Sequence, residues 1–238
     1  MTSRLQNSLR ERGAVATVRS LRRRLATAVS TLADRHFDLV FGTETRGTVE
    51  NADLRDVTSA NLARGIRYEP TRAIPFRRVL RAARIPGEGA FVDLGCGKGR
   101  ACMLAALHGF EKVVGVDYSP DLCRIAERNF DAFRRRTGRN FHATVYSLDA
   151  TAYAFAPDDA VAYLYNPFDA SVLSAVVARL RTSLDAHPRR VSLVYQNPMW
   201  RDTVETSGLF VHAGDWSFGG CHFAVYRHDG QHPNDALR

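Results

Sequence analysis

Short apolar runs of this 238-residue sequence end at polar residues that could bind a ligand. The run 90–92 ends at Asp93 and leads into a G-x-G-x-G loop at 95–99. Glycines in such a loop adopt backbone angles closed to other residues and let the main chain approach a ligand at the start of a helix. The run 113–116 ends at Asp117, where a carboxylate can accept hydrogen bonds from two ribose hydroxyls. The pattern therefore indicates a nucleotide-type ligand.

Two further apolar runs end in the same way. The run at about 143–146 leads to Asp149, and the run 161–165 leads to Asn166. The carboxyl ends of parallel strands meet at one edge of a doubly wound sheet, so these two residues are expected to converge with the glycine loop and Asp117. Taken alone, each polar end is also consistent with an ordinary strand-end turn.

The spacing of these residues predicts the elements that position them. Asp93 and Asp117 are 24 residues apart, about the length of one strand–helix–strand crossover. The predicted fold class is therefore α/β, with a doubly wound, mainly parallel seven-stranded sheet whose last strand is antiparallel. Strands are predicted at 90–92, 113–116, 143–146, 161–165, 191–195, 209–212 and 222–226, and helices from Pro75, at 101–108, at 119–136 and at 169–186. Residues 215–220 are predicted to form an exposed hairpin loop.

Together these pieces resemble the class I (Rossmann-like) S-adenosyl-L-methionine (SAM)-dependent methyltransferases over roughly residues 65–227. The resemblance implies that the loop after Asp93 wraps the methionine part of SAM, that Asp117 holds the ribose and that Asp149 binds the adenine amino group. The Tyr-x-Pro-Thr string at 68–71 looks like a segment that closes over the amino-acid end of SAM, and it also fits a turn with a helix cap. The cofactor-binding residues implied in this way are Tyr68, Thr71, Asp93, Gly95, Cys96, Gly97, Gly99, Asp117, Tyr118, Asp149, Ala150 and Asn166.

The string Asn166-Pro167-Phe168 is similar to the (Asp/Asn)-Pro-Pro-(Tyr/Phe) motif of amino-group methyltransferases, with one proline missing. The resemblance implies a catalytic role for all three residues. Asn166 would accept hydrogens from a target NH₂ group and aim its lone pair at the methyl group, while Phe168 would stack on a planar or cationic acceptor. A second Asn-Pro, at 197–198, is expected to line the acceptor pocket with Trp200. The sequence offers no general base at a persuasive position, which favours transfer to nitrogen over transfer to oxygen.

Two other function classes remain open. A nicotinamide-dependent oxidoreductase also begins with a strand, a glycine loop and a helix, but Arg100 stands where its G-x-G-x-x-G fingerprint needs Gly or Ala. A catalytically silent SAM-fold module would keep the fold and contact nucleic acid through an N-terminal arginine helix. For an enzyme, the acceptor remains open among RNA, a protein side chain and a small metabolite.

The net charge of +8 is concentrated at the start of the chain. Residues 1–36 hold eight arginines against two acids, Glu11 and Asp34, so their net charge is +6. Apolar residues recur there at helical spacing, at Val18, Leu21, Leu25, Val29 and Leu32. This amphipathic segment is predicted to pack on the domain or on a second copy of the chain, to contact an acidic partner such as RNA, or to be a mitochondrial presequence.

Three segments are predicted: a basic helical extension with a lid-like connection at 1–64, a SAM-binding domain at 65–228 and a polar tail at 229–238. The apolar content of 45% is that of a soluble globular protein, and no run approaches the ~18 apolar residues of a membrane span. The four cysteines lack C-x-x-C spacing and the eight histidines form no ligand set. We therefore expect a reduced, cytoplasmic protein without a disulfide framework or a metal site.

Overall fold

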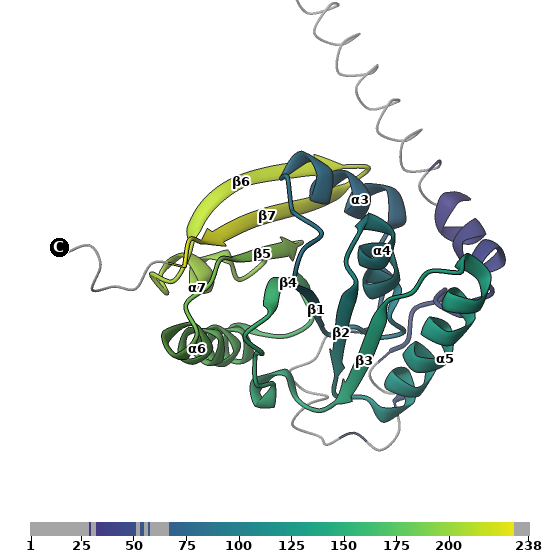
Figure 1. The fold of residues 1–238 in the computed structure, drawn as a ribbon, viewed down its shortest axis with the longest axis horizontal. Coiled ribbons are helices and arrows are strands. Elements are labelled where there is room, and N and C mark those ends of the chain that lie inside the picture. Colours follow the sequence, from purple (N-terminus) through teal and green to yellow (C-terminus); the bar gives the residue numbers. More distant parts are fainter. Residues whose placement is uncertain (1–28, 30–31, 51–52, 55–56, 58–66, 231–238) are drawn as a thin grey trace, which may run out of the picture.

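A single mixed sheet forms the centre of the molecule. The computed structural model describes residues 29, 32–50, 53–54, 57 and 67–230. Its strands are β1 (Ala90–Leu94), β2 (Lys112–Asp117), β3 (His142–Ser147), β4 (Asp159–Tyr165), β5 (Val191–Gln196), β6 (Val211–Phe218) and β7 (Cys221–His228). They lie in the order β3-β2-β1-β4-β5-β7-β6 (Figure 1), and β7 runs antiparallel to both of its neighbours. This α/β architecture confirms the predicted fold class.

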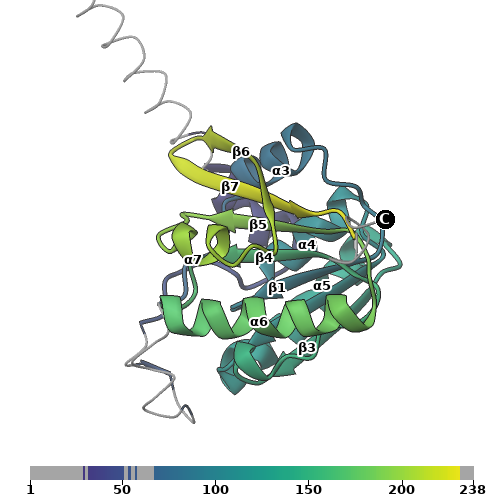
Figure 2. The ribbon, with the colours of Figure 1, turned by 90° about the vertical axis from the view of Figure 1, so that its left-hand side faces the viewer.

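Helices cover both faces of the sheet and enclose two apolar cores. On one face lie α3 (Ala73–Ala82), α4 (Arg100–His108) and α5 (Pro120–Thr137). On the other face lies α6 (Ala170–Ala186), with the short α7 (Arg201–Glu205) beside it (Figure 2). Successive residues of β1 divide between the two cores: Phe91 packs with Phe76 of α3, and Val92 packs in the core that includes Leu173 of α6. Within the described residues, no helix has the length and apolar character needed to span a membrane.

Local sequence sets where α5 and α6 begin, directly after the loops that carry the polar residues. The Ser119 hydroxyl accepts a hydrogen bond from Leu122 N at 3.4 Å, and Pro120 occupies the first helical position of α5. Asp169 caps α6 in the same way, accepting from two backbone N–H groups of its first turn. Capped helix starts hold the carboxyl ends of β2 and β4 at one edge of the sheet.

Two element boundaries differ from the prediction. α3 begins at Ala73, so Pro75 is its third residue and not its first. β6 continues to Phe218, so the predicted hairpin loop at 215–220 is wrong and the turn is Gly219-Gly220 alone. β6 is an edge strand with largely exposed side chains, where polar residues are tolerated and the apolar alternation of a buried strand is weak.

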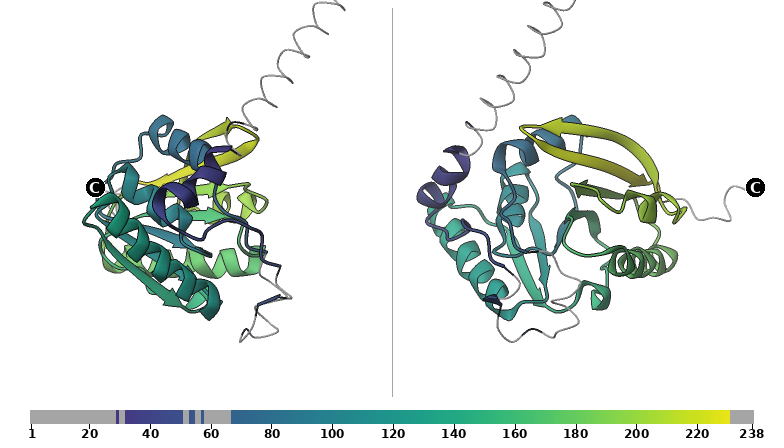
Figure 3. Two further views of the ribbon diagram at one scale, coloured as in Figure 1. Left: turned by 90° about the vertical axis from the view of Figure 1, so that its right-hand side faces the viewer. Right: turned by 180° about the vertical axis from the view of Figure 1, so that it is seen from behind.

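The described N-terminal residues pack differently from the predicted apolar stripe. Residues 32–41 are helical and lie beside α5 (Figure 3), where the rings of Phe41 and Phe133 have centroids 4.8 Å apart. Val29 and Leu32 are 51% and 56% exposed, so these two positions of the stripe do not pack on the domain. The other stripe positions lie outside the described residues. The helix thus continues to residue 41 within the segment 1–64, and the domain boundary at 64 stays a prediction.

Arg100, the first residue of α4, joins this N-terminal segment to the glycine loop. Its side chain is 1% exposed, and its Nε donates to Thr45 Oγ1 at 2.6 Å. Its terminal nitrogens lie 3.4 Å from Asp34 Oδ1 and 3.8 Å from Asp38 Oδ2, and the guanidinium lies 5.0 Å from the centroid of the Phe37 ring. A buried charge is tolerated when it is paired, so the arginine and the two carboxylates stabilise the fold only together.

Hydrogen bonds also join the N-terminal segment to the glycine loop. Asn129 of α5 accepts from Glu44 N at 2.7 Å and donates to Lys98 O at 2.9 Å. The Lys98 ammonium donates to Arg46 O at 3.1 Å. Residues 44–46 and the glycine loop are therefore bound to each other directly and through α5.

Replacing Arg100 by Met is expected to lower the free energy of unfolding by about 3–5 kcal/mol, because the substitution leaves Asp34 and Asp38 without their shared cation. Denaturant unfolding measures the loss. Arg124→Met is the matched control, since Arg124 pairs with Asp121 on the exposed face of α5, and its cost is expected to stay below about 1 kcal/mol. Equal losses in the two variants would contradict the role assigned to Arg100.

Candidate functional site

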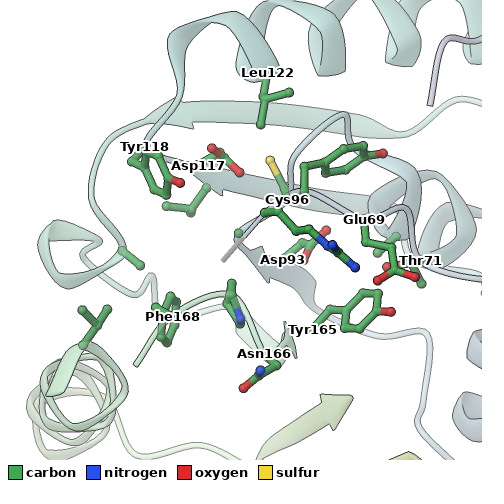
Figure 4. A pocket seen from close by; sticks show the side chains of 18 of the residues that line it. Glu69, Thr71, Asp93, Cys96, Asp117, Tyr118, Leu122, Tyr165, Asn166 and Phe168 are labelled. Atoms are coloured by element: carbon green, nitrogen blue, oxygen red, sulfur yellow. The ribbon is translucent and has the colours of Figure 1, made fainter. Parts of the chain in front are cut away.

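A cavity of about 400 Å³ opens at the carboxyl edge of the sheet (Figure 4). The loops after β1, β2, β3, β4 and β5 all contribute to its wall, as expected from strands paired in parallel register. Twelve of the predicted site residues line it: Tyr68, Thr71, Asp93, Gly95, Cys96, Asp117, Tyr118, Asp149, Ala150, Asn166, Pro167 and Phe168. The convergence expected from the strand ends is thus present in the structure.

Gly97 and Gly99 do not line the cavity, although both were predicted to bind the cofactor. Both have positive φ, 52° and 82°, which favours glycine. A Cβ at Gly97 would overlap the Tyr68 ring, and a Cβ at Gly99 would lie under 3 Å from the Phe130 ring. These glycines therefore permit close packing of the loop on the protein, and Gly95 is the loop glycine that faces the cavity.

The Asp117 carboxylate is held by the main chain. Its Oδ2 accepts a hydrogen bond from Gly97 N at 2.8 Å, and its Oδ1 accepts from Ser119 N at 2.9 Å. Burial raises the pKa of this carboxyl to about 6, and the two backbone donors act against that rise. Each oxygen keeps a further lone pair, so the carboxylate can still accept hydrogen bonds from a ligand in the cavity.

The wall beyond Asp117 is mostly apolar and is formed by Tyr118, Leu122, Leu148, Ala150, Phe168 and Val172. Phe168 is 7% exposed and packs in the core beneath α6 (Figure 4). In the same view it lies on the side of the cavity that Tyr118 also lines. Asp149 sits at the polar end of this wall, where its Oδ1 accepts from the Thr151 N–H at 2.8 Å and from the Thr151 hydroxyl at 2.6 Å. The wall suits a flat, largely apolar group with a polar edge.

Asn166 stands at the end of β4 with its carboxamide held in place. Its Oδ1 accepts from the Tyr195 hydroxyl at 3.1 Å, and its Nδ2 lies 3.1 Å from Met199 Sδ. Asn166 has a φ of 41°, and Asn197 at the end of the neighbouring strand has a φ of 49°. Both precede a proline in a conformation that asparagine tolerates better than most residues, so backbone geometry accounts for part of the preference for Asn at these positions.

The 68–71 string is tied to the rest of the site. The Tyr68 hydroxyl donates to Thr45 O at 2.8 Å, and its ring covers Gly97. Thr71 Oγ1 lies within hydrogen-bonding distance, 3.2 Å, of the Tyr163 hydroxyl. Asp93 is buried beneath the same region, and burial together with the nearby Asp117 raises its pKa well above the usual range. These residues support the wall of the cavity in addition to lining it.

Sequence reasoning missed several lining residues, notably Arg67, Glu69, Tyr165 and Met199. Two of them had a signal in the sequence: Glu69 lies inside the recognised 68–71 string, and Tyr165 directly precedes Asn166. Asn197 lines the cavity as expected, whereas Trp200 is not among the lining residues. Within the described residues, no cluster of His, Cys, Asp or Glu has the arrangement of a metal site.

Comparison with known sequences identifies a domain within the chain. Residues 91–186, which run from β1 to the end of α6, match a family described as a methyltransferase domain. The matched segment is a methyltransferase domain. This match confirms the resemblance, the enzyme class and the SAM cofactor expected from the sequence. No curated protein matches the chain.

Solved structures with a similar fold include several methyltransferases. An RNA methyltransferase from Salinibacter ruber, in complex with S-adenosyl-L-homocysteine, is 20% identical, with a TM-score of 0.49, and the match covers 71% of this chain and 98% of that one. A magnesium protoporphyrin IX methyltransferase from Synechocystis PCC 6803 with bound SAM is 15% identical, with a TM-score of 0.46, covering 64% of this chain and 74% of that one. A ribosomal protein L11 methylase from Lactobacillus delbrueckii subsp. bulgaricus is 13% identical, with a TM-score of 0.48, covering 65% and 77%.

The affinity of the methyltransferase domain for SAM is expected to rise as pH increases from about 5 to about 7. Asp117 has a pKa raised to about 6, so it is largely protonated at the lower pH and ionised at the higher. The ionised carboxylate is the stronger acceptor for ribose hydroxyls, so SAM binding improves through this interval and lowers the pKa of Asp117 in turn. Calorimetric titrations at a series of pH values measure the profile.

Two variants make this profile specific. Asp117→Asn is expected to bind SAM at least about tenfold more weakly at pH 7, through loss of a charge-assisted acceptor, and to show no step near pH 6. Asp121→Asn, an exposed position in the first turn of α5, should reproduce the wild-type profile. A step near pH 6 that survives in Asp117→Asn would show that another group titrates.

Proposed function

We propose that this enzyme transfers the methyl group of SAM to a nitrogen nucleophile. The cavity fits SAM in two respects: a buried carboxylate with free lone pairs at Asp117, and an apolar wall from Leu148 to Val172. In this proposal the loop at 95–97 holds the methionine part, Asp117 takes the ribose, and Asp149 binds the adenine amino group. Phe168 then contacts the adenine side of the cofactor, and its stacking on the acceptor stays a prediction.

Asn166 is the observation that carries the proposal. The residue is 8% exposed and lines the cavity, and its carboxamide oxygen accepts a hydrogen bond from the Tyr195 hydroxyl. A side chain held in this way loses little freedom when it binds an acceptor, so it can set the direction of a nucleophile at small entropic cost. An N–H group is a natural partner for the remaining lone pair of the amide oxygen.

Orientation is the main contribution that the protein has to make. Bound SAM would supply an activated methyl group, and its sulfur would keep the electron pair of the broken bond, so no further activating group is needed from the protein. A correctly placed nucleophile can gain ~7–11 kcal/mol from proximity and alignment. Asn166 aligns the acceptor nitrogen, and Tyr195 and Met199 hold Asn166. Pro167 packs against Gly95, which keeps the end of β4 in register with the glycine loop.

The broader choices of acceptor and partner stay proposals. RNA, a protein side chain and a small molecule all contain nitrogen nucleophiles. Seven of the eight N-terminal arginines lie outside the described residues, so neither nucleic-acid contact through them nor a homodimer through the N-terminal helix gains support from the structure. The silent-module alternative is less favoured, because the matched family is described as a methyltransferase domain.

Replacing Asn166 by Ala is expected to lower turnover by at least about 100-fold, because a small misplacement of the nucleophile is that costly. SAM affinity should change little, since the other predicted cofactor contacts remain. Transfer of label from radioactive SAM to fractionated lysate measures turnover, and calorimetry measures SAM binding.

Asn197→Ala is the control for backbone strain, since it places Ala at a similar φ after the neighbouring strand. The two variants should lose similar stability, while Asn197→Ala keeps most of the turnover. Loss of SAM binding in Asn166→Ala, with normal turnover at saturating SAM, would assign Asn166 to the cofactor and contradict its role in transfer.

A further inference from the structure

The part of the cavity away from the apolar wall contains a carboxylate that the proposed function does not yet use. Glu69 lines the cavity beside Tyr165, on the far side from Tyr118 and Phe168 (Figure 4). Asn166 stands between these two sides in the same view. Glu69 therefore belongs to the wall of the cavity opposite the apolar wall.

Neighbouring arginines already have acidic partners. Arg72 has its Nε 3.5 Å from Asp34 Oδ2 and donates to Gly219 O at 2.9 Å. Arg100 lies between Asp34 and Asp38, as described above. Asp38 Oδ2 also lies 3.5 Å from Arg46 Nε, so all three arginines already have a carboxylate partner in the N-terminal segment.

Arg67 also lines the cavity, and its positive charge is paired with the carboxylate of Glu50. Its guanidinium lies 3.6 Å from Glu50 Oε1, with both side chains more than half exposed. Glu69 is exposed, and it takes part in none of the salt bridges within the described residues. Glu69 is therefore a carboxylate on this side of the cavity that takes part in no salt bridge among the described residues.

Tyr165 adds a neutral oxygen next to that charge. Burial and the adjacent Glu69 carboxylate raise the pKa of the Tyr165 phenol, so it stays protonated at neutral pH. Together with Asn166, the site presents three oxygen groups that can accept hydrogen bonds, and one of them is charged. A protonated primary amine carries three N–H donors and one positive charge, which matches this set.

Met199 adds an apolar surface next to these oxygens. Met199 lines the cavity and is 68% exposed, at the loop that follows β5. A flexible thioether side chain adapts to an aliphatic chain better than to a rigid planar ring. Its exposure leaves room for an aliphatic arm to lie along it while the amine at the end of the arm reaches Asn166.

We propose that the acceptor is a primary amine on an aliphatic arm, bound first as the ammonium ion, and that Glu69 is the residue that selects it. This inference rests on the proposed transfer to nitrogen. Before transfer the ammonium loses one proton to solvent water. Water has access to this group because Glu69 is exposed. Carboxylate- or phosphate-bearing arms of the same length are repelled by the same residue, so Glu69 contributes both attraction and exclusion.

Three probes of equal chain length are titrated into the protein loaded with S-adenosyl-L-homocysteine: hexylammonium, hexanol and hexanoate. NMR measures the affinity for each probe. Wild-type protein is expected to bind hexylammonium most tightly and hexanoate least. The Glu69→Gln variant should bind hexylammonium about tenfold more weakly, because one charge-assisted interaction is lost. Its affinities for hexanol and for S-adenosyl-L-homocysteine should be unchanged. Glu111→Gln, an exposed position just before β2 and away from the cavity, controls for the change in net charge and should behave as wild type.

Each outcome bears on a separate claim. Equal hexylammonium affinity in wild type and Glu69→Gln, or a preference of the wild type for hexanoate, would overturn the selection of amines by Glu69. A loss of S-adenosyl-L-homocysteine binding in Glu69→Gln would overturn it too, by placing the residue in the cofactor site. The proposed function is tested apart from these titrations, by mass spectrometry of the labelled lysate acceptor, where a methyl group found on oxygen or sulfur contradicts transfer to nitrogen.

Discussion

The buried carboxylate of Asp117 is the point at which the parts of the site meet. One of its oxygens accepts from the glycine loop at Gly97, and the other accepts from Ser119, which caps α5. These two bonds join the turn after β1 to the turn after β2, so the relative position of the two neighbouring loops is fixed by one side chain. Because the carboxylate is buried and still accepts at both oxygens, its pKa sits near 6, where a ligand can shift its ionisation. The same group thus holds the loops and is available to a ligand.

A second set of contacts holds the glycine loop from outside the sheet. Arg100 follows the loop directly and is buried between Asp34 and Asp38, which come from the N-terminal segment. Tyr68 covers Gly97 and donates to Thr45 O of that segment. The glycines at 97 and 99 are thereby explained by protein packing, and the residue that breaks the dinucleotide fingerprint, Arg100, is explained by its ion pairs. The N-terminal segment is in this sense part of the support of the site.

Much of the site could be predicted from the sequence because it depends on local patterns. An apolar run that ends in a polar residue marks the end of a buried strand, and parallel strands bring such ends together; Asp117, Asp149 and Asn166 follow from that rule. The helix starts at Ser119 and Asp169 follow from capping chemistry in the same way. These features require only residues near one another in the chain.

The failures concern contacts between distant residues or weak local patterns. The partners of Arg100 lie more than 60 residues before it, and nothing in their spacing marks them as a buried cluster. The burial of Phe168 depends on α6 packing over it, which its motif does not show, and its role toward the acceptor stays a prediction. The edge strand β6 lacks a buried face on which an alternation would show. Glu69 stood in a recognised string, yet its approach to Tyr165 depends on how the segment before α3 folds over the sheet.

The central claim, that this cavity is a SAM site, is tested most directly by calorimetric titration of the purified protein with SAM and, separately, with NAD. The account predicts one site for SAM with a dissociation constant in the micromolar range and no heat of binding for NAD. Micromolar binding of NAD with none for SAM would contradict it, because the same strand, loop and carboxylate would then serve a dinucleotide.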